Sequence, residues 1–266
     1  MPIIDAAGAA IYYETVGSGD PLVLIPGFAS GAWSWFCQAD LAKDLCVITF
    51  DPSGIGRSRA VQDANLSDIS MTTFVDDVLR LLNALKIENA HILGASFGGF
   101  VAQEFALRFP DRVSKLILAC TTAGGKDHVS PNIEILRSFT RDPEMSLGEQ
   151  IRRFLRPAFT ERFCSEHAAK FEKVCHLREE HEVSDTTYLA QLQTAFSFDV
   201  SDRLGEIRHE TLVITGDTDN LVPMQNSVNL AGKLPDAKLS ILENAGHMIF
   251  IENAVEFNKI VSEFLI

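Results

Sequence analysis

The segment Gly94-Ala95-Ser96-Phe97-Gly98 constrains the fold of this chain more than any other. It follows the apolar run 91–93 and precedes residues 97–109, whose apolar spacing predicts a helix. A Gly-x-Ser-x-Gly sequence between a strand and a helix is typical of a strained turn that lifts a serine hydroxyl above the edge of a sheet. Side chains at 94 and 98 would collide with the neighbouring strand or helix where the turn is tightest. The pattern therefore predicts a strand–turn–helix unit that presents Ser96.

Short apolar runs alternate with helical patterns along most of the chain. A helix is predicted at about 72–86, with residues 73–76 as its capping box. Because the strands are short, continuously apolar and separated by helices, they indicate a mostly parallel sheet flanked by helices on both faces. The first two strands, joined by a turn at 17–20, are expected to form a hairpin. The predicted strands are 11–14, 22–25, 46–50, 91–93, 115–119, 211–215 and 238–242.

Residues 126–203 interrupt this alternation. Apolar residues recur there at helical spacing, and a connection of this length without a strand pattern exceeds a normal loop. We interpret the block as a helical insertion that divides a core made of residues 1–125 and 204–266. It contains seven of the 18 phenylalanines, of which most are expected to pack the insertion together and a minority to line an apolar cavity over Ser96. Helices are expected near 133–139, 151–155, 163–179 and 185–197.

Composition excludes several classes of function. The net charge of −13 argues against binding to nucleic acid or to an anionic membrane surface, since both need clustered Lys or Arg. The five cysteines are scattered without a Cys-x-x-Cys pair, which favours reduced thiols over disulfides or a zinc site. With no signal-peptide pattern and no apolar run of membrane length, we expect a cytoplasmic protein.

A serine hydroxyl becomes a good nucleophile when a base takes its proton and a carboxylate orients the base. In a strand–helix architecture of this kind, the order along the chain is serine, acid, histidine. Of the seven histidines only His247 follows both Ser96 and the strand 211–215 that could carry the acid. The turn after that strand contains both Asp217 and Asp219, and spacing alone does not separate them. The other aspartate is expected to form or cap the turn.

The oxyanion formed by attack on a carbonyl needs hydrogen-bond donors, usually two backbone N–H groups. One is expected from Phe97, directly after the serine. The second is expected from Phe28 in the loop 26–31, where Gly27 would permit the turn that aims this amide inward.

These motifs resemble the α/β-hydrolase superfamily along essentially the whole chain. The resemblance implies an α/β-hydrolase fold in which residues 126–203 form a helical cap after the sixth core strand. In the family's Gly-x-x-Asp-x-x-Val-Pro motif the acid stands three residues after the glycine, which is Asp219 here. One departure is Pro26, where many members have histidine, so any role of that histidine side chain is missing. The matching segments are 26–31, 50–58, 94–99, 216–223 and 245–247.

Within the superfamily the chain looks most like the carboxylesterase and 3-oxoadipate enol-lactonase group. This implies a serine hydrolase without cofactor or metal that cleaves a carboxylic ester, a lactone or a related small, largely apolar carbonyl compound. A carbon–carbon hydrolase or an acyltransferase would use the same triad, and a ligand sensor with slow turnover is the alternative from another class. Many of the carbon–carbon hydrolases have an aromatic residue directly after the catalytic histidine, where this chain has Met248.

Four side chains are candidates for substrate contacts: Trp33, Phe139, Phe154 and Met248. Other chemically suggestive residues have simpler structural interpretations. Asp51 is interpreted as shaping the loop 51–58, and Cys120 as a buried thiol. Three arginines could bind a substrate carboxylate, but a solvated helix face is the favoured interpretation for Arg152, Arg153 and Arg156.

Overall fold

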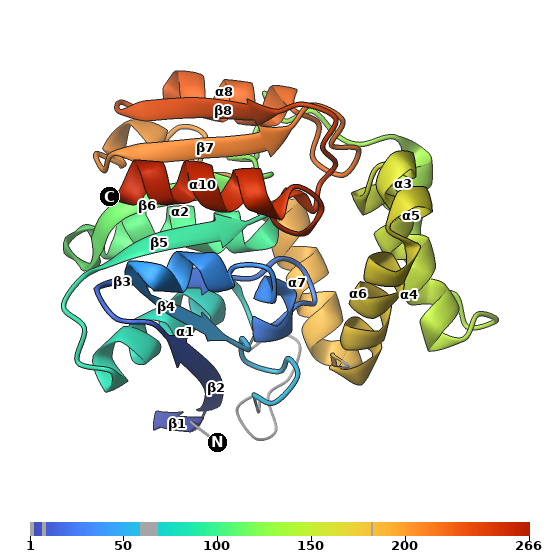
Figure 1. Ribbon diagram of the computed structural model, residues 1–266, viewed down its shortest axis with the longest axis horizontal. Coiled ribbons are helices and arrows are strands. Elements are labelled where there is room, and N and C mark those ends of the chain that lie inside the picture. The colour runs from blue at the N-terminus through green and yellow to red at the C-terminus, as the bar shows by residue number, and fades with distance from the viewer. Residues whose placement is uncertain (1–2, 7–8, 59–68, 182) are drawn as a thin grey trace.

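The computed structural model describes residues 3–6, 9–58, 69–181 and 183–266. In these residues eight strands form one sheet in the order β1-β2-β4-β3-β5-β6-β7-β8 (Figure 1). All neighbouring pairs from β4 to β8 are parallel, and β1 and β2 add an antiparallel edge. The strands are β1 (Ile3–Ala6), β2 (Ala9–Val16), β3 (Asp20–Ile25), β4 (Leu45–Phe50), β5 (Ala90–Ala95), β6 (Val113–Ala119), β7 (Thr211–Gly216) and β8 (Ala237–Leu242).

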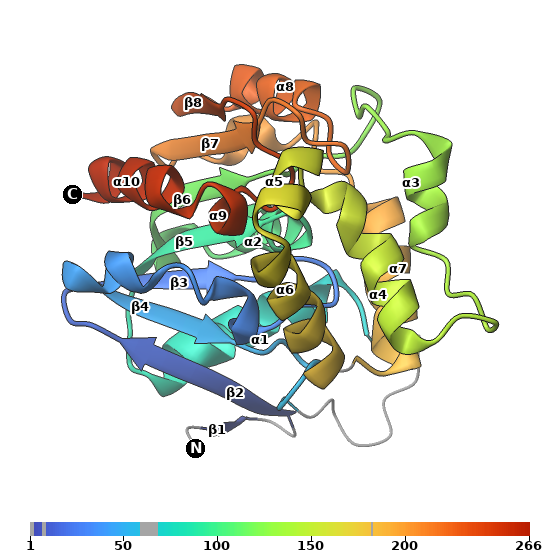
Figure 2. The same ribbon diagram turned by 45° about the vertical axis from the view of Figure 1, so that its right-hand side comes forward.

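Helices cover both faces of the sheet. In Figures 1 and 2, α1 and α2 lie behind the sheet and α10 lies in front of it. None of the described helices is long and apolar enough to cross a membrane. The helices are α1 (Met71–Ala84), α2 (Phe97–Arg108), α3 (Ile133–Ser138), α4 (Leu147–Leu155), α5 (Glu161–Glu166), α6 (Ala168–Glu180), α7 (Asp185–Ser197), α8 (Gln225–Lys233), α9 (Ile249–Glu252) and α10 (Ala254–Leu265), with short 3₁₀ turns η1 (Ala32–Trp35), η2 (Ala39–Lys43), η4 (Pro110–Arg112), η5 (Arg156–Ala158) and η6 (Leu204–Glu206).

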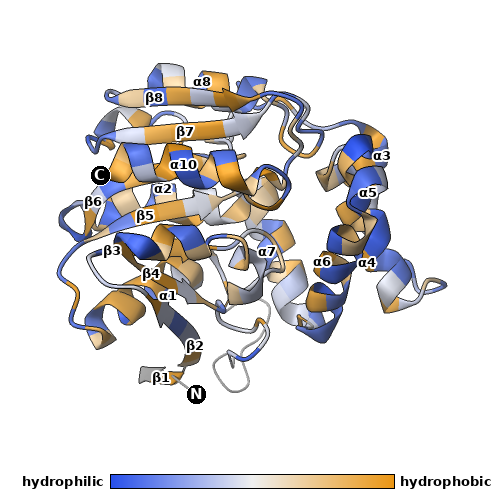
Figure 3. Ribbon diagram, viewed as in Figure 1, coloured by the Kyte–Doolittle hydropathy of each residue, from blue (hydrophilic) through white to orange (hydrophobic). Residues whose placement is uncertain are grey.

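The predicted parallel sheet is confirmed, and its apolar runs explain it. Every residue of β5 and β7 is buried, because each strand is covered on both faces and paired on both sides. Figure 3 shows the same strands as mostly apolar. Since parallel strands end at the same edge, the turns after β5 and β7 are brought together there. This edge holds all the candidate catalytic side chains.

The predicted hairpin is wrong. β2 pairs with β4, not with β3, and β4 lies between them. The run 22–25 is buried throughout, which suits a central strand with parallel partners on both sides, β4 and β5. Adjacent position in the chain favours pairing but does not determine it.

Two helix predictions also need correction. The capping box of α1 begins at Ser70, whose N–H donates to Thr73 Oγ1 at 3.2 Å, and does not span 73–76. The helix predicted at 163–179 is two helices, α5 and α6, because the backbone leaves helical geometry at His167. The helix predicted at 185–197 has the observed bounds of α7.

The helices α3 to α7 lie beyond the carboxyl ends of the strands (Figures 1 and 2). A cluster of phenylalanine rings packs part of this insertion: Phe159 stacks on Phe163 at 4.9 Å between centroids and meets Phe171 edge-on at 5.7 Å. The ring of Phe198 stacks instead on Phe100 of α2, at 4.4 Å. The insertion therefore packs internally and also against the core. Its exact boundaries at 126 and 203 stay a prediction.

Asp51 joins two loops at the same sheet edge. Its Oδ1 accepts from the Ala32 N–H at 2.8 Å, and its Oδ2 accepts from the backbone N–H and the Nε of Arg57 at 3.0 and 2.9 Å. The side chain of Asp51 is completely buried. The interpretation of Asp51 as a loop-shaping residue is confirmed.

We expect Asp51→Ala to lower the free energy of unfolding by about 3 kcal/mol, because it leaves two backbone amides without their acceptor and removes the buried partner of the Arg57 guanidinium. Glu14→Ala is the matched control, since Glu14 pairs with the same Arg57 at 3.1 Å but is 46% exposed. Its loss should stay below about 1 kcal/mol. Urea unfolding followed by circular dichroism measures both. Equal losses would contradict the assignment of Asp51 as the structural partner.

Candidate active site

Ser96 occupies the turn between β5 and α2 with φ 54° and ψ −118°, a backbone conformation that a residue with a side chain rarely adopts. Neighbouring segments hold it there. The Ser96 N–H donates to the Ala119 carbonyl at 2.8 Å, and the Ser96 carbonyl accepts from the Gly99 N–H and from Thr121 Oγ1, each at 2.8 Å. The end of β6 therefore fixes the strained residue from the side.

The two glycines of the motif are required because a side chain at either position would collide with neighbouring backbone. A Cβ at Gly94 would lie 2.2 Å from the Gly98 carbonyl oxygen, and a Cβ at Gly98 would lie 2.2 Å from the carbonyl oxygen of Ile25. Both distances are too short for real atoms, so the expected collision with the adjoining helix and strand is confirmed. Glycine lets the start of α2 approach β3 closely enough to form the turn.

His247 and Asp219 form a buried pair. His247 Nδ1 lies 2.8 Å from Asp219 Oδ2, and because a carboxylate only accepts, the ring N–H donates. The other oxygen, Oδ1, accepts from the N–H groups of Leu221 and Val222 at 2.9 and 2.8 Å. With the Asp219 side chain fully buried and bonded through both oxygens, the orientation of the imidazole is fixed.

Asp217 has a different task in the same turn. Its Oδ1 accepts from the Ala245 N–H at 3.3 Å, and the Ala245 carbonyl accepts from the N–H and Oγ1 of Thr218 at 3.1 and 2.8 Å. These bonds tie the turn after β7 to the loop that carries His247. The geometry thus gives the histidine contact to Asp219 and a loop contact to Asp217.

The helical insertion also holds the histidine loop. The N–H groups of His247 and Met248 both donate to the Ala158 carbonyl, at 2.9 and 3.0 Å. Glu252 accepts from the N–H groups of Thr160 and Gly246 at 3.2 and 3.3 Å. The position of the imidazole therefore depends on η5 and on the start of α5 as well as on the core.

Ser96 and His247 line the same cavity, whose volume is about 70 Å³. Among the hydrogen bonds of the described residues there is none between the Ser96 hydroxyl and the imidazole, a looseness common before substrate binds. The cavity wall is otherwise mostly apolar. The remaining lining residues are Gly27, Phe28, Ser30, Ser34, Ala95, Phe139, Phe154, Leu155, Ala158, Arg178, Leu221, Val222, Met248 and Phe250.

Three of the four predicted substrate contacts lie at this cavity: Phe139, Phe154 and Met248. Trp33 does not line it. The Trp33 indole is buried and stacks on the imidazole of His181 at 6.3 Å between ring centroids. Two of the seven phenylalanines of the insertion thus face the cavity, in keeping with the expectation of a minority.

The backbone N–H groups of Phe28 and Phe97 have no acceptor among the described residues, so both are available to a ligand. The reason predicted for Gly27 is wrong. Gly27 does not adopt a left-handed backbone, and a Cβ there would make an ordinary contact of 3.4 Å with the Ala95 carbonyl. The left-handed residue of this loop is Ala29, with φ 49°, and its N–H donates to Gln191 Oε1 at 2.7 Å. A contact from α7 therefore shapes the loop.

Cys120 lies fully buried at the end of β6, beside the acid–histidine pair. Its Sγ, a carboxylate oxygen of Asp219 and a ring nitrogen of His247 all lie within 4.8 Å of one another. A metal-bound thiol must lose its proton, but burial and the adjacent Asp219 carboxylate raise the pKa of the Cys120 thiol well above its usual range. These three side chains therefore fit a neutral thiol next to a hydrogen-bonded pair better than a metal centre.

Arg178 was not predicted as a site residue, yet it is the one permanently charged side chain among the residues that line this cavity. A signal was present in its spacing. Phe171, Val174, Cys175 and Arg178 stand at i, i+3, i+4 and i+7 of α6, and all are buried. The helical period thus places an arginine on the buried face. The arginines that were considered, Arg152, Arg153 and Arg156, each pair with a carboxylate outside the Ser96 cavity.

Comparison with known proteins agrees with this architecture. A family model described as the alpha/beta hydrolase fold matches residues 20–179 and 176–254. The chain belongs to the α/β-hydrolase family. The predicted fold class is thereby confirmed.

Several relatives match over nearly their whole length. The chain is 30% identical to RutD of Azorhizobium caulinodans, whose name proposes carbamate hydrolysis, over 99% of this chain and 98% of that protein. It is 30% identical to 2-hydroxymuconate semialdehyde hydrolase of Pseudomonas sp. strain CF600, over 98% and 92%. Among solved structures, the meta-cleavage product hydrolase CumD of Pseudomonas fluorescens IP01 superposes with a TM-score of 0.84 at 28% identity, over 99% and 97%. These comparisons support an enzyme of the α/β-hydrolase family.

Proposed function

We propose that this protein is a serine hydrolase that cleaves a carboxylic ester, a lactone or a related small carbonyl compound through an acyl-enzyme intermediate. The observation that carries the proposal is the convergence of Ser96, in its strained turn, and His247, oriented by Asp219, on one small cavity. A nucleophile and an oriented base at the wall of a mostly apolar cavity are the parts that acyl transfer requires.

In the proposed reaction, Ser96 Oγ attacks the carbonyl carbon while His247 Nε2 takes the hydroxyl proton. Asp219 holds the Nδ1–H and stabilises the imidazolium that forms. The free amides of Phe28 and Phe97 would donate to the oxyanion. His247 then protonates the leaving group and activates the water that hydrolyses the acyl-enzyme. The Ser96–His247 hydrogen bond would form as substrate fills the cavity.

The helical insertion, residues 126–203, serves in this proposal as a cap over the site. Phe139, Phe154, Leu155 and Ala158 come from it and line the Ser96 cavity, and Ala158 also fixes the histidine loop. The five cysteines are free thiols, in keeping with a cytoplasmic protein.

We expect Ser96→Ala to lower kcat by several orders of magnitude, on the scale of about 10⁶ known for loss of a catalytic serine. The measurement is hydrolysis of p-nitrophenyl butyrate, with reaction of the intact protein with a fluorophosphonate as a second readout. Ser114→Ala, which changes an exposed serine of β6, is the control and should keep full activity. A Ser96→Ala variant with most of its activity would refute the mechanism. Negligible turnover by the unmodified protein, with tight ligand binding, would favour the slow-turnover sensor.

Asp217 and Asp219 lie in one turn and therefore allow a matched pair of variants. Asp219→Asn should lower kcat by about 10⁴, because an amide no longer holds the imidazole in the tautomer that accepts the serine proton. Asp217→Asn should cost less than about tenfold, since it weakens one backbone contact at 3.3 Å. Steady-state rates on the same ester measure both effects. Equal losses would contradict the assignment of Asp219 as the triad acid.

A carbon–carbon hydrolase is the second candidate, because relatives at 28–30% identity are named as meta-cleavage product and 2-hydroxymuconate semialdehyde hydrolases. The same triad would serve that reaction. We expect kcat/KM for a short acyl ester to exceed that for a vinylogous diketone, since Met248 stands where many such enzymes carry an aromatic residue. The measurement compares both compounds with one protein preparation. Faster cleavage of the diketone would replace the ester assignment with carbon–carbon hydrolysis.

A further inference from the structure

Arg178 differs from every other arginine of the insertion. Residues 126–203 contain eight arginines, and seven of them lie within 4 Å of a carboxylate. Arg178 makes no ion pair and donates no hydrogen bond to any described residue. Its side chain is nevertheless buried, with the residue only 8% exposed. The protein thus keeps one cation inside the insertion without an anion beside it.

An unpaired buried cation is unfavourable, because little in its surroundings replaces the lost hydration. The ring of Phe154, 4.4 Å from the guanidinium carbon, offsets part of this cost through a cation–π contact. Burial lowers the pKa of Arg178 to about 10, which still leaves the side chain charged at neutral pH. A strongly perturbed, partnerless charge at a cavity wall indicates a ligand that supplies the opposite charge.

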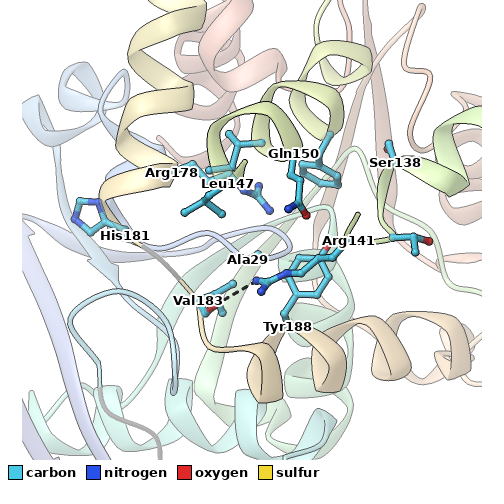
Figure 4. A pocket seen from close by; sticks show the side chains of 12 residues that line it. Ala29, Ser138, Arg141, Leu147, Gln150, Arg178, His181, Val183 and Tyr188 are labelled. Atoms are coloured by element: carbon cyan, nitrogen blue, oxygen red, sulfur yellow. Dashed lines mark hydrogen bonds between the residues drawn. The ribbon is translucent and has the colours of Figure 1, made fainter. Parts of the chain in front are cut away.

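Arg178 stands between two cavities. It lines the Ser96 cavity and also a second one of about 50 Å³ inside the insertion, which we call the insertion cavity. Phe154 is shared by both as well. Figure 4 shows the Arg178 side chain projecting into the insertion cavity, opposite Arg141 and Tyr188. No Asp or Glu is found among the described residues that line either cavity. Both spaces are therefore free of competing acceptor carboxylates.

We propose that Arg178 binds a carboxylate group of the substrate, so that the compound cleaved at Ser96 carries an acidic end directed toward the insertion. The planar guanidinium offers two parallel N–H groups that match the two oxygens of a carboxylate. One unpaired cation balances one negative charge, which favours a carboxylate over a phosphate dianion. Arg141 does not supply a second free charge, because it pairs with Asp185.

The proposed carboxylate site deepens the proposed function. It rests on that function only in the assumption that an ester or related carbonyl bond is cleaved at Ser96. It also changes the expected substrate. The wall of the Ser96 cavity is mostly apolar, so the body of the substrate is apolar as predicted, but one end is anionic. Since Ser96 and Arg178 line the same cavity of about 70 Å³, only a short chain separates the carbonyl from the carboxylate.

The activity test uses two methyl esters of nearly equal shape: monomethyl glutarate, which is anionic, and its neutral counterpart with a primary amide in place of the acid. Methanol release gives kcat/KM for each ester, and the ratio of the two values measures the effect of the substrate's negative charge. We expect the unmodified protein to prefer the acid by about thirtyfold or more, the range for loss of one partner of a buried charge pair. Arg178→Met should bring the ratio close to one, and Arg178→Lys should restore part of it.

Arg152→Met is the matched control, since Arg152 is a cation of the same insertion that faces solvent and pairs with Glu172. It removes one positive charge and should leave the ratio unchanged. Arg178→Met is expected to melt at the same temperature as the unmodified protein or higher, because it removes an unpaired buried charge. If this variant fails to fold, Arg178→Lys and Arg178→Gln carry the comparison. An acid-to-amide ratio that is the same with and without Arg178 overturns the proposal.

A binding experiment separates this proposal from the proposed reaction. Calorimetry with the Ser96→Ala protein compares butyrate with butyramide, and the Ser96→Ala, Arg178→Met double variant is the control. We expect butyrate to bind tighter than butyramide, and the difference to vanish in the double variant. Selective butyrate binding by the Ser96→Ala protein, combined with no ester hydrolysis by the unmodified protein, would uphold the carboxylate site and refute the reaction. Equal binding of both compounds would refute the carboxylate site alone.

Discussion

The strained backbone of Ser96 is the constraint on which the rest of the site depends. A residue with φ 54° and ψ −118° needs neighbours that compensate its strain, and three hydrogen bonds to Ser96 backbone atoms do so, two of them from the end of β6 and the loop after it. The same turn works only because Gly98 lets α2 approach the carbonyl of Ile25. That approach places the loop 26–31 beside the serine, and Phe28 of this loop lines the cavity. Packing of three segments thus positions both the candidate nucleophile and the candidate oxyanion donors.

The helical insertion holds the loop of the proposed base as well as shaping the cavity. Ala158 accepts hydrogen bonds from both His247 and Met248, so the histidine loop is fixed between the core and η5. Asp219 orients the imidazole from the core side through the ring Nδ1. A displacement of the insertion would therefore move the base relative to Ser96.

Most of the strands and candidate site residues that could be predicted came from local sequence patterns. Apolar runs located seven of the eight described strands and missed β1 at the antiparallel edge, and the serine–acid–histidine order selected His247 from seven histidines. Pairing between strands is non-local, which explains why the chain neighbours β2 and β3 were wrongly paired. Asp217 and Asp219 could not be separated by spacing, because two residues of one turn reach the same edge. The resemblance to the family's motif favoured Asp219, and the side-chain contacts agree with that choice. Trp33 follows the loop 26–31 closely in sequence, yet its ring stacks on His181 and does not line the cavity.

No sequence pattern predicts that Arg178 lacks a carboxylate partner. Helical spacing places it on the buried face of α6, but a buried arginine is unremarkable when a carboxylate accompanies it. Its significance comes from the lack of such a partner among the described residues, which depends on every segment that folds around it. The net charge of −13 would by itself argue against binding of an anion. Surface carboxylates are screened within about 8 Å at physiological ionic strength, whereas a buried charge would act on a bound anion with much less screening. A strongly acidic protein can therefore still attract an anion at one internal position, provided that the cavity wall excludes its own carboxylates.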